Sequence, residues 1–193
     1  APWPSQPPDN PCYETNAVYA VSADGELVWR YPSADPGLDN WLLAPPALSV
    51  DGRTLYLGTF AVDPSVPGVL LALDLTQPAD ASDDQRRKWQ LELRNDARPL
   101  GPSVSIRTIA VGRDGRIYCG GMETQLVGIS PAAFAVEDEG TRGRYAWDPA
   151  IIEPAGYPAD THFAAGVALD ESAAGVRTVF VSTTHLQTAN GEG

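Results

Sequence analysis

The sequence predicts an all-β protein built from repeated sheets of four antiparallel strands. Helical periodicity is nearly absent, and most apolar runs have strand length and are rich in Val, Ile, Leu and Tyr. The 193 residues include 18 glycines and 18 prolines, which indicates many turns. Aromatic residues also recur at a regular spacing, which is typical of a repeat architecture.

Twelve strands and their turns follow from these patterns. The predicted strands are 17–21, 26–30, 46–50, 53–59, 68–75, 87–94, 104–111, 116–120, 124–130, 144–148, 163–169 and 177–183. The Asp-Gly pairs at 24–25, 51–52 and 114–115 separate consecutive strands, and this dipeptide suits a tight hairpin. Ser130-Pro131 resembles a helix start, which predicts a turn or two of helix before Gly140.

The repeat is carried by three columns of residues. Tyr56, Tyr118 and Phe180 are each 62 residues apart, and an aliphatic residue or cysteine flanks each of them. An apolar strand precedes each of these aromatic residues. In the third column, a short apolar segment precedes a tryptophan: Ala20-Val21-Ser22 before Trp29, Ala72-Leu73-Asp74 before Trp89, and Gly128-Ile129-Ser130 before Trp147.

A unit of about 60 residues with four antiparallel strands is typical of a β-propeller blade. The sequence therefore predicts two full blades flanked by two half blades, with a β-sandwich of coincidental spacing as the alternative. We expect the three tryptophans to be buried at equivalent places, and Tyr56, Tyr118 and Phe180 to superpose.

The domain organisation is a Pro-rich lead-in over 1–15 and a repeat segment over 16–193. The last predicted strand is followed by 185–192, after which another apolar strand is due. We therefore expect the propeller to be incomplete by itself. Further blades of the same protein, a second copy or another subunit would complete it.

The segment from Ala20 to Trp29 resembles the tryptophan-docking motif of the PQQ-like (quinoprotein-type) propeller repeats, in which Ala-x-Asp is followed by a Gly turn and Trp. Ala72-Leu73-Asp74 with Trp89 resembles a second copy, and Gly128-Ile129-Ser130 with Trp147 a degenerate third. Enzymes of this family use a catalytic Asp, a Ca²⁺ site and a vicinal disulfide, and no such residues can be mapped here. The resemblance therefore implies the non-catalytic scaffold branch, whose members are subunits of larger complexes.

The residues assign no catalytic, cofactor-binding or metal-binding site. The two histidines, His162 and His185, lie at strand ends, and histidines so placed do not by themselves define a catalytic triad. The carboxylate run at 137–139 is either a solvated loop or a Ca²⁺ ligand set, and it lacks the spacing of a dedicated calcium loop. Cys12 and Cys119 either form a disulfide or remain a free and a buried thiol.

Other features bear on compartment and partners. The opening Ala1-Pro2-Trp3-Pro4 fits either a mature N-terminus after signal cleavage or an arbitrary boundary, and the first reading predicts a periplasmic or extracellular protein. Lys88 is the only lysine, which favours a bacterial source with an arginine bias. Trp3 and Trp41 lie outside the repeat columns and either anchor an interface or pack locally.

Charge excludes several partners. The chain has 25 acidic and 13 basic residues, a formal net charge of −12. Such a surface repels nucleic acid, and no apolar run is long enough to span a membrane. The leading hypothesis is a non-catalytic exported propeller module that contacts other proteins in an assembly. The alternatives are a fragment of a quinoprotein-like oxidoreductase, with Ca²⁺ and PQQ as cofactors, and a carbohydrate-binding propeller.

Overall fold

The computed structural model describes residues 17–33, 41–61, 68–93, 104–125, 128–140, 142–151 and 162–185, and it confirms the all-β prediction. Within these residues, every strand pairing is antiparallel. The elements are β1 (Val18–Val21), β2 (Leu27–Tyr31), β3 (Trp41–Leu43), β4 (Ala47–Leu48), β5 (Thr54–Ala61), β6 (Gly68–Asp74), α1 (Asp83–Arg86), β7 (Arg87–Leu93), β8 (Val104–Val111), β9 (Arg116–Gln125), β10 (Gly128–Glu139), β11 (Arg142–Ile151), β12 (His162–Ser172) and β13 (Gly175–His185).

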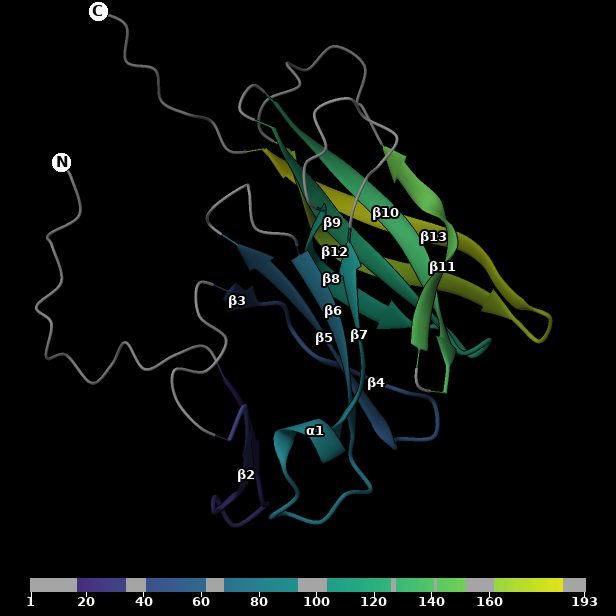
Figure 1. The fold of residues 1–193 in the computed structure, drawn as a ribbon. Helices are drawn as coiled ribbons and strands as arrows, with labels where there is room; N and C mark the ends of the chain where they lie inside the picture. The colour runs from purple at the N-terminus through teal and green to yellow at the C-terminus, as the bar shows by residue number, and fades with distance from the viewer. Residues whose placement is uncertain are drawn as a thin grey trace, which may run out of the picture.

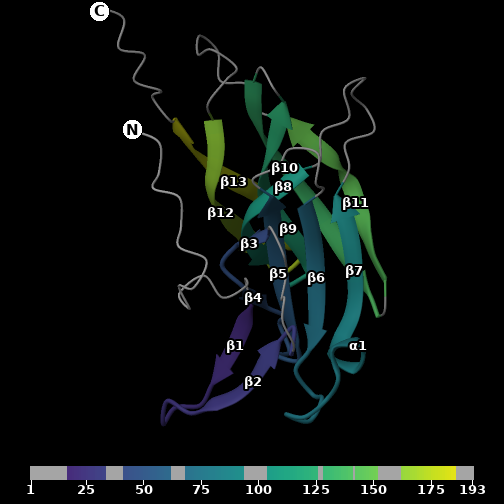
Figure 2. The same cartoon turned by 60° about the vertical axis from the view of Figure 1, so that its left-hand side comes forward.

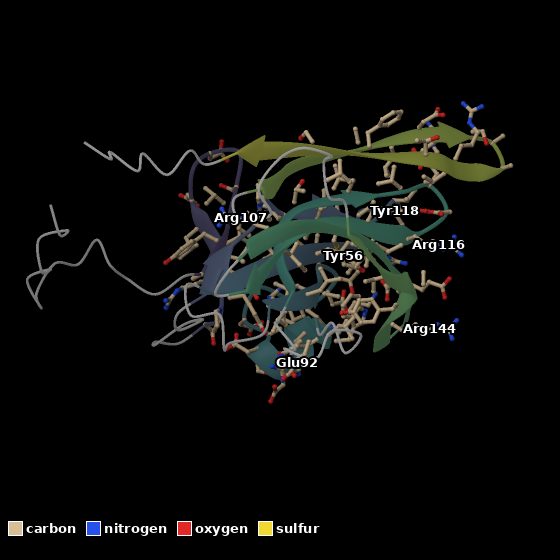
Figure 3. The ribbon with its side chains drawn as sticks, turned by 90° about the horizontal axis from the view of Figure 1, so that it is seen from above. Tyr56, Glu92, Arg107, Arg116, Tyr118 and Arg144 are labelled. Atoms are coloured by element: carbon tan, nitrogen blue, oxygen red, sulfur yellow. The ribbon has the colours of Figure 1, made fainter. Side chains whose placement is uncertain are left out.

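The strands form four sheets, which follow one another along the chain (Figure 1). Sheet I is β1–β2, sheet II is β3–β7, sheet III is β8–β11 and sheet IV is β12–β13. Sheet II contacts sheet III through β5 and β8, and sheet III contacts sheet IV through β8 and β12. Seen from above, sheet IV is an outer layer that covers sheet III (Figure 3). Sheet I is a separate hairpin below sheet II, away from sheet IV (Figure 2).

The hairpin turns lie where the Asp-Gly pairs predicted them. Gly25, Gly52 and Gly115 have φ angles of 86°, 69° and 81°. Glycine adopts positive φ without the steric cost of a Cβ, so these turns reverse the chain tightly between β1 and β2, β4 and β5, and β8 and β9.

Sheets II and III carry the same four residues in the same order across four strands each, which are β4–β7 in sheet II and β8–β11 in sheet III. In sheet II, the opposed residues are Ala47, Tyr56, Ala72 and Trp89. In sheet III, they are Ala110, Tyr118, Ala135 and Trp147. We call this arrangement the Ala–aromatic–Ala–Trp row.

Each terminal sheet carries half of this row. Sheet IV has the first two positions, with Ala168 opposite Phe180, and sheet I has the last two, with Ala20 opposite Trp29. The pairing register shifts immediately after the alanine that faces each tryptophan: Ala20/Val21, Ala72/Leu73 and Ala135/Val136. A shared bulge at the same row position shows that the three strand pairs are structurally equivalent.

Sheet II is buried on both faces. Along β6, six consecutive residues from Gly68 to Leu73 are buried. Leu57, Val69, Leu71 and Leu73 pack with Tyr31 and the partly buried Trp29 of sheet I. On the opposite face, a second cluster joins sheet II to sheet III; it contains Tyr56, Leu70, Ala72, Trp89, Ile106, Ile117, Cys119 and Val136. Two-sided burial of a strand requires a continuous apolar run rather than alternation, and β6 has one.

The structure differs from the sequence prediction in the third repeat. Trp147 faces Ala135 rather than Gly128, so the segment paired with the third tryptophan is Ala135-Val136-Glu137 and not the predicted Gly128-Ile129-Ser130. The expected helix after Ser130-Pro131 is absent, because residues 128–139 form one strand that pairs with β9 and β11. Pairing on both sides outweighs the local helix-start signal. The sequence also did not predict the short strand β3 or the one-turn helix α1.

Candidate interaction site

The contact between sheets II and III centres on the carboxylate of Asp138, at the end of β10. Tyr56 donates its hydroxyl hydrogen to Asp138 Oδ2 at 2.6 Å, and the indole Nε1 of Trp89 donates to Oδ1 at 2.9 Å. Lys88 Nζ lies 3.7 Å from Oδ2 and also donates to Thr54 Oγ1 at 2.9 Å. Asp138 of sheet III therefore fixes two aromatic side chains of sheet II in one orientation.

Backbone shape completes this contact. A Cβ on Gly143 of β11 would lie 2.8 Å from Cζ3 of Trp89, so the indole ring packs directly on the glycine backbone. A Cβ on Gly58 of β5 would overlap Ile106 of sheet III. Glycine at both positions allows the two sheets to approach closely.

Sheet I docks on sheet II by a different contact. The guanidinium group of Arg86, at the end of α1, lies 4.5 Å from the ring centroid of Trp29. Arg86 is 1% exposed, and its Nη2 donates to the carbonyl oxygen of Pro78 at 2.7 Å. Asp83 accepts a hydrogen bond from the Ser33 backbone at 2.9 Å. Segment 77–87 thus positions a cation–π contact for sheet I.

A polar depression of about 510 Å³ lies where the turns of sheets III and IV meet, and Asp114, Arg116, Glu137 and Asp138 line it. Glu137 accepts hydrogen bonds from Arg144 at 2.9 Å and from Arg116 at 3.2 Å. These bonds, from Arg144 first and Arg116 second, hold the pKa of Glu137 below its usual range. Figure 3 shows Arg116 and Arg144 at the same end of the molecule.

The carboxylates around this depression bind protein donors. Asp114 accepts the hydroxyl hydrogen of Tyr118 at 2.7 Å, and burial, aided by this bond, raises the pKa of Tyr118 to about 12. No group of three or more His, Cys, Asp or Glu side chains that could hold a metal ion occurs in the described part of the chain. In the 137–139 run, Glu137 thus joins neighbouring strands of sheet III through its arginine contacts, and Asp138 joins sheet III to sheet II.

The terminal sheets expose row positions that the inner sheets bury. Tyr56 is 2% exposed and Tyr118 is 4% exposed, whereas Phe180 at the same row position is 58% exposed. Val21 is 58% exposed, whereas Leu73 and Val136, which follow the equivalent alanines, are fully buried. Five of the seven large exposed hydrophobic side chains in the described residues belong to β1, β2 and β13: Tyr19, Val21, Leu27, Val28 and Phe180.

These five side chains form two apolar surfaces. The sheet I surface, on β1 and β2, consists of Tyr19, Val21, Leu27 and Val28. The sheet IV surface consists of Phe180 and the exposed Ala168 opposite it. Large apolar side chains that are exposed on edge strands mark interaction sites. We take the two surfaces as the candidate interaction site.

The structure accounts for the predicted site residues unevenly. Trp89 is buried and Trp29 partly buried, while Trp147 is placed in the row by the register of β11. Trp41 lies on β3 opposite Ala61. Trp3 and Cys12 are outside the described residues. Nothing is described of the side chains of Trp147 and Trp41, so their predicted burial and interface roles stay predictions.

Cys119 is buried in the core between sheets II and III, and no described residue bonds to its sulfur. Burial raises its pKa, which keeps the sulfur protonated and unreactive. The disulfide to Cys12 stays a prediction, because Cys12 is outside the described residues. His162 opens β12 and His185 ends β13, where they are opposed in the register.

Sequence reasoning missed the roles of Arg86 and Asp138, which contact Trp29 and Trp89. Asp138 lies 49 residues from Trp89 and 82 from Tyr56, so no local pattern links them. The sequence did contain a signal for the correct alignment of the third repeat. Ala135-Val136-Glu137, followed by Gly140 and Trp147, resembles the pattern of Ala-x-Asp, Gly and Trp more closely than the segment at 128–130 does.

Comparisons with known proteins return no relative: no family model matches the chain, and neither a curated protein nor a solved structure matches it. The sheets, their row and the exposed terminal surfaces are therefore the basis of the functional argument.

Proposed function

We propose that the chain is a β-propeller-type module of the PQQ-like repeat class, exported to a bacterial periplasm or beyond, which binds other protein chains in an assembly. The observation that carries this proposal is the exposure of Phe180 at a row position where Tyr56 and Tyr118 are buried. The same row position is buried in the inner sheets and exposed in the terminal sheet. A bound protein that covers Phe180 is the simplest explanation of this difference.

The architecture supports the propeller part of the proposal. The first strands of adjacent sheets contact each other, β4 with β8 and β8 with β12, and so do the fourth strands, β7 and β11. The blades of a propeller follow one another in chain order around an axis, and strands at the same position in neighbouring blades are adjacent. The sheets of this chain have the same arrangement. The corrected third segment, Ala135-Val136-Glu137, restores an acidic residue at the position of Asp74, which strengthens the resemblance to tryptophan-docking repeats.

The polar contacts support the non-catalytic part. Asp114, Glu137 and Asp138 are the carboxylates at the polar depression, and each accepts hydrogen bonds that hold strands or sheets together. Groups occupied in this way stabilise the stack and are not poised for proton transfer to a ligand.

Site-specific photo-crosslinking in the native cells tests this function. A benzoylphenylalanine at Phe180 or Val28 should capture protein, whereas the same probe at Thr76, an exposed turn residue of sheet II, should not. If neither terminal sheet yields a protein adduct under conditions in which the chain is folded, the proposed function is wrong. Binding of Ca²⁺ with quinone absorbance would favour the oxidoreductase alternative instead.

A further inference from the structure

The two terminal sheets are complementary halves of one four-stranded sheet. Sheet IV supplies the first two positions of the Ala–aromatic–Ala–Trp row, Ala168 and Phe180, and sheet I supplies the last two, Ala20 and Trp29. Placing β13 beside β1 with Phe180 opposite Ala20 would reproduce the pairs Tyr56–Ala72 and Tyr118–Ala135 of the inner sheets.

We propose that β13 of one copy pairs antiparallel with β1 of a second copy, with Phe180 opposite Ala20, and that the reciprocal pairing closes a ring of six sheets. This inference rests on the proposed function, because it names a second copy of the chain as the protein that covers the terminal sheets. Within one chain, β1–β2 and β12–β13 are separate sheets. Closing one chain on itself would give three sheets, fewer than the four to eight blades of closed propellers, whereas two copies give six.

The same register covers the exposed side chains. It places Val179 opposite Val21, as Leu55 faces Leu73 and Ile117 faces Val136 in the inner sheets. Leu73 and Val136 point toward the preceding sheet, so Val21 would point toward sheet III of the other copy and become buried. Phe180 would point toward sheet II of the copy that supplies β1, in the way that Tyr56 points toward Ile106 and Ile117.

Charge at the turns is also complementary in this register. Arg177 of β13, now paired with Asp170 at 2.9 Å, would come beside the β1–β2 turn, which carries Asp24 and Glu26. In sheet III, the corresponding end of the second strand places Arg116 at 3.2 Å from Glu137 of the third strand. An arginine near the acidic turn offsets part of the repulsion between two chains of formal charge −12.

Sedimentation of the purified chain tests whether the second copy binds. We expect a dimer that Phe180→Asp and Val21→Asp each weaken by about 30-fold or more in Kd, as for a central buried contact. Val50→Asp is the matched control, because Val50 is 66% exposed at the β4–β5 turn, on the side of sheet II that faces sheet III of its own chain, and should leave the dimer intact. A chain that stays monomeric at high micromolar concentration, or a dimer insensitive to both aspartates, would overturn the proposal.

Disulfide trapping tests the register. Opposed residues of an antiparallel pair have Cα atoms close enough for a disulfide. In a Cys12→Ser background, mixing a Phe180→Cys chain with an Ala20→Cys chain should give a covalent heterodimer, and Phe180→Cys with Ser22→Cys should give much less. The double variant Ala20→Cys with Phe180→Cys should also crosslink between chains; a bond formed only within one chain overturns the proposal.

The outcomes separate this inference from the proposed function. A monomer whose Phe180 probe still captures a different protein refutes the second copy and leaves the binding function standing. A monomer whose probes capture nothing refutes both.

Discussion

Tyr118 and Phe180 occupy the same row position in neighbouring sheets, yet one is buried and the other exposed. Tyr118 is 4% exposed, and its ring lies near Gly112 and Asp114 at the contact with sheet IV. Phe180 is 58% exposed, because no described element covers that face of sheet IV. The register therefore sets where a side chain lies within its sheet, and the adjacent sheet sets how much that side chain stabilises the fold.

The largest effect is expected from one substitution made at both positions. Tyr118→Thr removes a buried aromatic ring and should cost about 3–5 kcal/mol of unfolding free energy. Phe180→Thr keeps a β-branched residue in the strand and should change the unfolding free energy of the monomer by no more than about 0.5 kcal/mol.

Urea denaturation measures both variants at a protein concentration low enough to exclude association. Tyr118→Phe is the control, since it retains the ring and loses the hydroxyl group with its bond to Asp114, at about 1 kcal/mol. Similar losses for the two threonine variants would show that sheet IV is covered even in the monomer.

Gly143 offers a second way to test what an adjacent sheet contributes. Gly143→Ala places a methyl group against the indole of Trp89, and overpacking of this kind costs about 1–3 kcal/mol. Thermal unfolding and the fluorescence of the tryptophans should both change. Gly115→Asn is the control, because Gly115 has nothing within 4 Å of its Cβ position and asparagine tolerates its positive φ. An unchanged melting temperature in Gly143→Ala would show that the contact is loose.

Most of the strand order could be predicted from the sequence, because hairpin turns and apolar runs are local signals. Gly25, Gly52 and Gly115 lie in the turns that their Asp-Gly pairs predicted. The third repeat could not be aligned, since Pro131 normally interrupts a strand and here lies within β10 opposite Met122. The functions of Asp138 and Arg86 depend on contacts between separate sheets, and no spacing along the chain encodes them.

The contact between sheets I and II should be weaker than the contact between sheets II and III. Arg86→Met keeps the length of the side chain and removes its charge and its bond to Pro78, so Trp29 loses its cation partner. We expect a loss of about 1–2 kcal/mol, with faster hydrogen exchange confined to β1 and β2. Arg113→Met is the control, because Arg113 is exposed on the β8–β9 turn of sheet III, outside sheets I and II. Uniformly faster exchange in all four sheets would show that sheet I unfolds together with the rest.

The smallest effect is expected at Glu137, where two arginines hold the carboxylate in its charged form. Its pKa is lowered in the folded chain, by Arg144 first and then by Arg116, so the folded protein binds this proton less readily than the unfolded chain. The stability from Glu137 is therefore complete above the ordinary glutamate pKa of about 4.3, and it is lost as the pH falls through the lower folded-state value. Glu137→Gln should lower the melting temperature slightly near pH 7, where the stability from the carboxylate is complete, and the difference from the wild type should close below pH about 4.5, which flattens the acid profile. The control is Glu26→Gln, the same substitution at an exposed position of the β1–β2 turn, outside sheet III. If the melting temperatures of Glu137→Gln and the wild type differ by the same amount at every pH, Arg116 and Arg144 do not hold the carboxylate in its charged form in solution. The turn end of sheet III would then lack the ion pairs that distinguish it from the exposed turn of sheet I.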